Sequence, residues 1–93
     1  MSFKTAIKRP LRRLYLNYRD RKGKTDAQVK LLRQYQIDVV LDVGANTGQY
    51  AKRLVRKGFR NNVVSFEPLP DAFSKLQGRC AEHDNWSARN HAL

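Results

Sequence analysis

The sequence has little of what a disulfide-stabilised, metal-binding or membrane-spanning protein needs. Cys80 is the only cysteine, which excludes an internal disulfide, and with two histidines in the chain we predict no metal site. No stretch approaches the roughly 18 apolar residues of a membrane span. The beginning of the chain also lacks the apolar run of about 7 to 15 residues that a secretory signal requires. We therefore expect a cytoplasmic protein.

Acidic residues are also few, and the resulting positive charge is concentrated at one end. The chain has 19 Lys and Arg against 8 Asp and Glu, a formal net charge of +11. Residues 1–24 carry nine basic groups and one acid, which gives +8, and the remaining residues carry ten and seven, which gives +3. Clustered cations attract nucleic acid, anionic lipid and acidic proteins alike, so charge alone does not choose the partner.

The basic segment also has an apolar stripe. Five apolar residues recur at steps of four, four, three and four: Phe3, Ile7, Leu11, Leu14 and Tyr18. This spacing predicts an amphipathic helix, which begins near Arg9 because Pro10 is tolerated only in a first helical turn. We therefore divide the chain into a basic helical arm and linker, residues 1–24, and a domain, residues 25–93. The arm is expected to pack on the domain; an anionic membrane surface at the inner face or an acidic partner, bound through residues 4–24, is the alternative, and nucleic acid ranks lower.

The rest of the chain alternates between helix and strand patterns. A helix from Thr25 or Asp26 to Gln36 precedes a mostly apolar strand, 37–43, and a second helix stops at Gly58. A strand over 63–67, a helix capped by Asp71 and strand character over 86–93 follow. This order predicts an α/β fold with a parallel sheet and helices on both faces. Because a doubly wound domain has about five to seven strands, we expect a domain truncated after about the third.

The strongest functional signal is the turn of residues 42–50, between the first domain strand and its helix. Gly44 and Gly48 permit backbone conformations or close approaches that a Cβ would obstruct, and the helix start offers free N–H groups to a polar or anionic ligand. A dinucleotide fingerprint would need glycine where Asn46 and Gln49 stand, and a P-loop would need Lys after Gly48. An acid two residues before the first glycine remains, as in the turn of Rossmann-like methyltransferases that lies against the methionine part of S-adenosylmethionine.

The second signal is Glu67, which ends the next strand 25 residues after Asp42. Ligands of open parallel sheets occupy the crevice at the carboxyl ends of the strands, so both acids are expected to point into one site. A carboxylate in that position can accept hydrogen bonds from both vicinal hydroxyls of a ribose. Pro68 then ends the strand.

Together, residues 40–51 and 64–69, with Ala72, Phe73, Leu76 and Trp86 behind them, make the stretch 29–93 resemble the start of FkbM-family methyltransferases. The resemblance implies a Rossmann-like class I methyltransferase fold, S-adenosylmethionine as cofactor, and O-methylation of a sugar, glycan or other hydroxylated small molecule. In that family further strands follow, so we expect an N-terminal, cofactor-binding fragment. The cofactor-binding residues are then predicted to be Asp42, Gly44, Ala45, Asn46, Gly48, Glu67 and Pro68.

No residue is a convincing catalytic base, so none is assigned. His83 and His91 lie in the late, polar part of the chain and are expected on the surface, and Cys80 is expected to be a small buried hydrophobic residue. Two other interpretations stay open. One is an inactive remnant of a methyltransferase, and the other is a basic module for nucleic acid or membranes that retains the turn.

Overall fold

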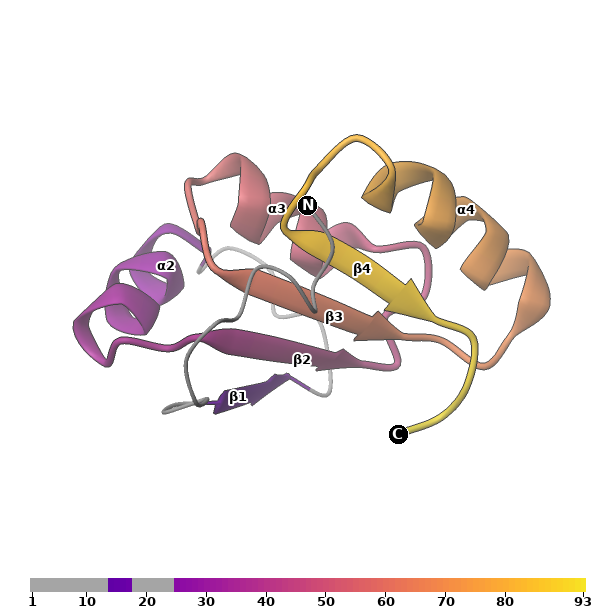
Figure 1. The fold of residues 1–93 in the computed structure, drawn as a ribbon, viewed down its shortest axis with the longest axis horizontal. Coiled ribbons are helices and arrows are strands. Elements are labelled where there is room, and N and C mark those ends of the chain that lie inside the picture. Colours follow the sequence, from indigo (N-terminus) through magenta and orange to yellow (C-terminus); the bar gives the residue numbers. More distant parts are fainter. Residues whose placement is uncertain (1–13, 18–24) are drawn as a thin grey trace.

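The computed structural model describes residues 14–17 and 25–93, which form a parallel sheet and three helices (Figure 1). The strands are β1 (Leu14–Asn17), β2 (Val39–Val43), β3 (Asn62–Phe66) and β4 (Trp86–Arg89). They lie in the order β1-β2-β3-β4, and each pairs in parallel with the next. The helices α2 (Thr25–Gln34), α3 (Gln49–Arg56) and α4 (Pro70–Cys80) each connect one strand to the next. The predicted α/β fold with a parallel sheet is confirmed.

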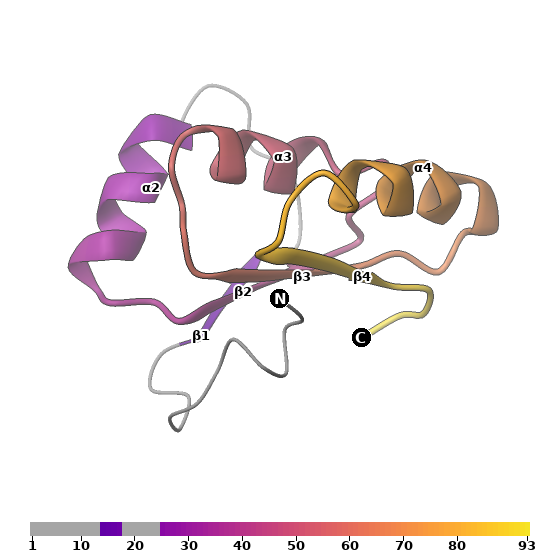
Figure 2. The ribbon, with the colours of Figure 1, turned by 45° about the horizontal axis from the view of Figure 1, so that its top comes forward.

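The helices α2, α3 and α4 all lie on one face of the sheet (Figure 2), so the prediction of helices on both faces is wrong for the residues that the structure describes. Each helix connects neighbouring strands, and every step along the sheet has the same direction. Because a strand-to-strand crossover is right-handed, steps in one direction place all connecting helices on one side. A helical layer on the second face would require the strand order to reverse, which it does not do from β1 to β4.

Residues 14–17 were predicted as part of a helix, and in the structure they form strand β1. This strand extends the sheet beyond β2, with Leu14 opposite Val39 and Asn17 opposite Asp42. Tyr15 packs against the main core, and its hydroxyl accepts a hydrogen bond of 2.8 Å from Gln28 Nε2. Pairing with the edge of β2 therefore overrides the local helical spacing. The rest of the predicted arm, residues 1–13 and 18–24, lies outside the described residues.

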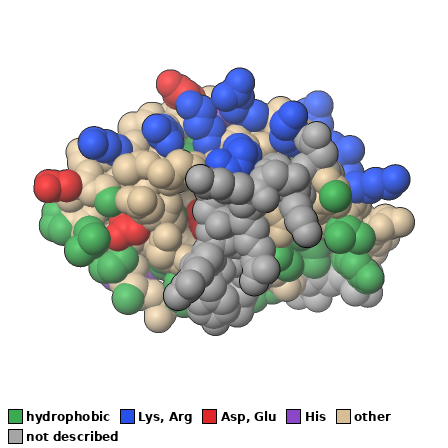
Figure 3. Space-filling model, turned by 180° about the vertical axis from the view of Figure 1, so that it is seen from behind, with side chains coloured by type: hydrophobic (Ala, Val, Ile, Leu, Met, Phe, Trp, Pro, Cys, Tyr) green, Lys and Arg blue, Asp and Glu red, His purple; other side chains and the backbone are tan. Residues whose placement is uncertain are grey.

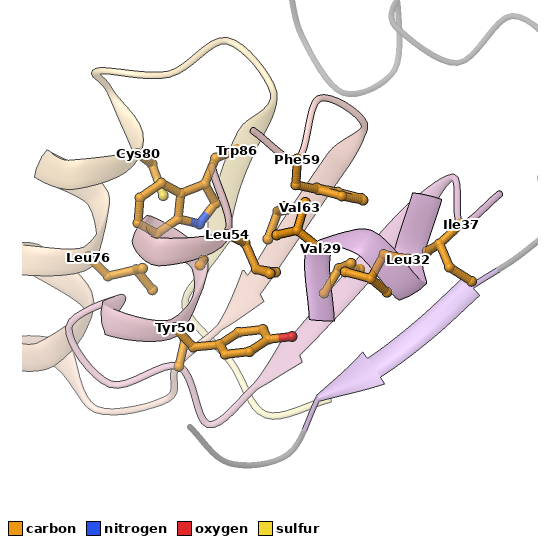
Figure 4. Close-up of a cluster of buried hydrophobic side chains, with 13 residues drawn as sticks. Val29, Leu32, Ile37, Tyr50, Leu54, Phe59, Val63, Leu76, Cys80 and Trp86 are labelled. Carbon is orange, nitrogen blue, oxygen red and sulfur yellow. The ribbon is translucent and has the colours of Figure 1, made fainter. Parts of the chain in front are cut away.

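The main core lies between the helices and the sheet (Figure 4). Its largest members come from all three helices and from three of the strands and their loops, among them Val29, Leu32, Tyr50, Leu54, Phe59, Val63, Leu76 and Trp86. On the opposite face of the sheet, Val39, Val64 and Phe66 form a second buried cluster. Because neighbouring residues of a strand point to opposite faces, strands between two apolar clusters need continuous apolar runs. This explains the runs predicted as β2 and β3.

The helix ends follow the predicted signals at one helix and differ at another. After α3, Gly58 adopts φ +100°, a left-handed conformation typical of a helix stop, as predicted. The expected capping of α4 by Asp71 is wrong, since Leu69 occupies the N-cap without a side-chain cap and Pro70 begins the helix. Proline is preorganised for that first position, and it holds Leu69 in an extended conformation. Asp71 instead lies in the first turn, where its charge complements the helix dipole.

Candidate functional site

The turn between β2 and α3 is built from three residues in left-handed conformations. Gly44 has φ +69°, Asn46 has φ +57° and Gly48 has φ +92°. The backbone N–H of Gly48 donates to the carbonyl of Ala45 at 3.0 Å, which closes the turn tightly. Asn46 is the non-glycine residue of the three, and asparagine tolerates this region because its short polar side chain bonds locally. The conformational roles predicted for Gly44 and Gly48 are therefore confirmed.

Gly48 also lies so close to Leu76 and Trp86 that no residue with a side chain would fit in its place. A Cβ at this position would lie 2.9 Å from Leu76 Cδ1 and 2.9 Å from two ring carbons of Trp86. The start of α3 is thus pressed against α4 and β4. Gly48 is the N-cap of α3 and provides no side-chain hydrogen bond, and no acid stands in the first turn. The backbone N–H groups of that first turn are therefore not capped by the N-cap side chain.

Glu67 lies at the tip of β3 and holds the turn. Its side chain is 5 % exposed. Oε1 accepts from the backbone N–H of Asn46 at 2.6 Å, and Oε2 accepts from the backbone N–H of Leu69 at 3.0 Å. A further bond of 3.0 Å joins the N–H of Ala45 to the carbonyl of Phe66. The tips of β2 and β3 are therefore adjacent, with the Glu67 carboxylate against the glycine-containing turn.

Asp42 lies beneath the turn and not at its rim. The residue is 2 % exposed, and its Oδ2 accepts a hydrogen bond of 3.1 Å from the Ser65 hydroxyl. The same hydroxyl oxygen accepts from Trp86 Nε1 at 2.9 Å. A buried chain of hydrogen bonds thus crosses three strands, from Trp86 through Ser65 to Asp42. The structure brings Asp42 and Glu67 to neighbouring strand ends on the helical side of the sheet, but gives them different surroundings.

Cys80 is part of this buried region. Burial raises the pKa of the Cys80 thiol from 9.0 to about 12, and the negative charge of nearby Asp42 adds to the rise. The thiol is therefore protonated at neutral pH and is a poor nucleophile, as expected for a buried structural cysteine. Of the two histidines, His91 is exposed and its ring meets Phe66 edge-on at 5.5 Å, whereas His83 is half-buried beside Trp86 at 5.9 Å.

Two residues of this region were missed from the sequence. Asn90 follows β4, and its side-chain amide donates to the carbonyls of Glu67 at 2.9 Å and Pro68 at 3.3 Å. Ser65 connects Trp86 to Asp42, as described above. The available signal for Ser65 was a polar residue inside an apolar strand, and for Asn90 a polar residue directly after a strand at the same sheet edge. Both became recognisable only when the strand order placed them beside the turn.

Within residues 14–17 and 25–93, no three His, Cys, Asp or Glu side chains form a group that could hold a metal ion. In the same part of the chain, no helix has the length and apolar character to cross a membrane.

No family model, curated protein or solved structure matches the chain. The fold defines the class as a small α/β protein, whose described residues form a four-stranded parallel sheet and three helices.

Proposed function

We propose that the 42–48 turn and Glu67 bind S-adenosylmethionine, and that the chain is the cofactor-binding part of a methyltransferase with a Rossmann-like fold. The observation that carries this proposal is the buried Glu67 carboxylate on the backbone of the turn, 2.6 Å from the N–H of Asn46. The position is the carboxyl end of adjacent parallel strands, where open α/β sheets bind their ligands. The resemblance of residues 29–93 to FkbM-family methyltransferases extends the proposal to O-methylation of a sugar, glycan or other hydroxylated small molecule.

The residues of the turn fit such a ligand in charge and hydrogen-bonding capacity. A carboxylate has about four lone-pair positions, and Glu67 uses one on each oxygen for the backbone N–H groups of Asn46 and Leu69. One position on each oxygen therefore remains for the vicinal hydroxyls of a ribose. Gly44 and Asn46 are exposed beside it. The backbone of this turn, including Ala45, and the start of α3 supply N–H groups for the amino-acid end of the cofactor.

The bound cofactor supplies an activated methyl group, and the part assigned to this chain is positioning. Glu67 holds the turn through two backbone bonds and thereby keeps its own carboxylate at a constant place. The chain from Trp86 through Ser65 orients Asp42 beneath the turn. Pro68 and Asn90 fix the loop after β3, since Asn90 bonds to the carbonyl of Pro68 and that of Glu67. Holding donor and acceptor in attack geometry is the main source of rate in methyl transfer.

Calorimetric titration of the full chain with S-adenosylhomocysteine tests the proposal. Glu67→Gln keeps the size of the side chain but removes its charge, and a hydrogen bond to a charged group contributes about 1.5–3 kcal/mol. We therefore expect an affinity loss of about 10-fold or more. Asn85→Ala is the matched control, since Asn85 also fastens loops by two hydrogen bonds, to the carbonyls of Phe59 and Asn61. This variant should bind like the wild type.

A ligand lacking the ribose hydroxyls separates contact from stability. If Glu67 accepts from the ribose, the losses caused by Glu67→Gln and by 2′-deoxy-S-adenosylhomocysteine are not additive, because both remove the same interaction. Additive losses, or an equal loss in Asn85→Ala, would contradict the assignment of Glu67 to the ribose. Absence of binding by the folded wild-type chain would contradict the proposed function as a whole.

A further inference from the structure

The outer surface of α2 and α3 is rich in basic side chains. Between residues 27 and 66 the two acids are buried, Asp38 at 8 % and Asp42 at 2 % exposure. All seven basic residues of this stretch are at least partly exposed, and we call them the α2–α3 basic face: Lys30, Arg33, Lys52, Arg53, Arg56, Lys57 and Arg60. Figure 3 shows Lys and Arg side chains gathered along the helical side of the molecule.

Contacts between the helices make this face continuous. Arg33 Nη2 donates to the carbonyl of Gly58 at 2.8 Å, which fastens α2 to the C-terminal end of α3. Along α3, Lys52 and Arg56 form one pair at a spacing of four residues, and Arg53 and Lys57 form another. Residues four apart are neighbours on a helix surface and are separated by a rise of about 6 Å. The cations therefore follow each other in rows across two packed helices.

The net charge of residues 25–93 is only +3, but most of their acids lie away from the α2–α3 basic face. Glu67, like Asp38 and Asp42, is buried, and the exposed acids between residues 27 and 93 are Asp71, Glu82 and Asp84. These three lie on α4 or in the turn that follows it. The acids of residues 27–93 thus lie either in the interior or on another part of the surface. A polyanion would meet these seven basic residues along this side, and the acid of the two helices is Asp26, in the first turn of α2.

The face lacks what a membrane-binding surface needs. An interfacial helix inserts an apolar stripe between the lipids. Of the four apolar residues of α3, however, Tyr50, Ala51 and Leu54 are buried in the core, and Val55 is half-buried against it. On α2, Leu31 is 50 % exposed and Tyr35 is 60 % exposed. Leu31 lies about 200° around the helix from Arg33, which faces α3, so this apolar pair points away from Arg33 and from α3. The face therefore offers charge without an apolar anchor.

We propose that the α2–α3 basic face binds the sugar–phosphate backbone of a nucleic acid without sequence selectivity. Four of its seven cations are arginines, whose planar guanidinium groups match phosphate oxygens in a bidentate manner. Phosphate contacts of this kind position a protein on a nucleic acid and carry no base information. The α2–α3 basic face shares no residue with the 42–48 turn, and the proposal does not rest on cofactor binding.

Fluorescence polarisation of the full chain with a labelled, mixed-sequence RNA of about 20 nucleotides tests the proposal over a series of salt concentrations. The test variant is Lys52→Gln/Arg56→Gln/Arg60→Gln. It spares Arg33, whose bond to Gly58 joins the helices. Each phosphate contact to a single strand contributes about 0.7 to the salt slope, so loss of three contacts should lower the slope by about 2. The corresponding affinity loss is about 100-fold at 0.1 M salt.

The matched control is Lys75→Gln/Arg79→Gln/Arg89→Gln, which removes the same charge from α4 and β4 and leaves residues 1–24 unchanged. This control should retain the salt slope and most of the affinity, and circular dichroism should show both variants folded. Equal losses in the two variants, no loss in the test variant, or no RNA binding by the wild type would overturn the proposal. The proposal would also be overturned if the test variant kept its RNA affinity but no longer sedimented with phosphatidylserine vesicles. That result would assign the face to a membrane.

Discussion

Replacing Gly48 by alanine should destabilise the protein strongly, for two reasons that can be counted separately. Alanine in the left-handed conformation, here φ +92°, costs about 1–2 kcal/mol. Its Cβ would also lie 2.9 Å from Leu76 Cδ1 and from the ring of Trp86, and relieving such overpacking in a core costs about 1–3 kcal/mol. The expected loss in the free energy of unfolding is therefore about 2–5 kcal/mol. A chain of this length has about 5–14 kcal/mol in total.

Urea denaturation followed by fluorescence measures this loss directly, because Trp86 is the only tryptophan and is buried. Two other glycines of the chain provide controls of different expected effect. Gly58→Ala meets the strain of φ +100°, but its Cβ would approach only the flexible end of Arg33, so it should lose about 1–2 kcal/mol. Gly78→Ala has open space in α4 and should gain about 0.5–1 kcal/mol. A loss for Gly48→Ala no larger than that of Gly58→Ala would refute the packing argument.

Two further predictions concern the buried hydrogen-bonded chain and the thiol beside it. Ser65→Ala leaves Trp86 Nε1 without its acceptor and removes a donor to Asp42, so the free energy of unfolding should fall by about 2–4 kcal/mol in urea denaturation. Ser74→Ala, on the exposed side of α4, should change the free energy of unfolding by less than about 0.5 kcal/mol. Equal losses in the two variants would argue against a contribution of the Trp86–Ser65–Asp42 hydrogen bonds. Because the pKa of Cys80 is raised to about 12, the native thiol stays protonated while the unfolded thiol ionises above pH 9. Stability is therefore unaffected by this group below pH 9 and falls by up to about 1.4 kcal/mol per pH unit above it. Melting curves of the wild type and Cys80→Ala from pH 8 to 10.5 should diverge in slope, and parallel pH profiles would show that the thiol does not contribute.

The candidate site could be predicted in part from local signals. The acid and glycines of residues 42–48 stand directly between a strand and a helix, and Glu67 ends the next strand, so both motifs were readable in the sequence. The burial of Asp42 and its bond to Ser65 could not be read in this way, because they depend on which strands are neighbours and in which register they pair. The two backbone bonds of Glu67 likewise arise from the approach of two loops.

The N-terminal segment shows where periodicity alone is insufficient. Spacing of apolar residues at four, four, three and four predicts a helix, yet residues 14–17 pair with the edge of β2. A short segment has too few residues for its own hydrogen bonds to decide its conformation, so a free strand edge nearby can decide it instead. In the same way, the prediction of helices on both faces was wrong because strand order, which is a non-local property, determines the side on which each helix lies.

The amino-acid sequence by itself determined the alternation of strands and helices after residue 24 and the shape of the glycine-containing turn. Both follow from properties of a few neighbouring residues, namely apolar periodicity and the backbone freedom of Gly44, Asn46 and Gly48. Only the tertiary structure decided that β1 joins the sheet, that the helices share one face, and that Asp38, Asp42 and Glu67 are buried while the basic residues of α2 and α3 stay exposed. The reason is that burial and charge separation result from contacts between segments distant in the chain, which local sequence patterns do not contain.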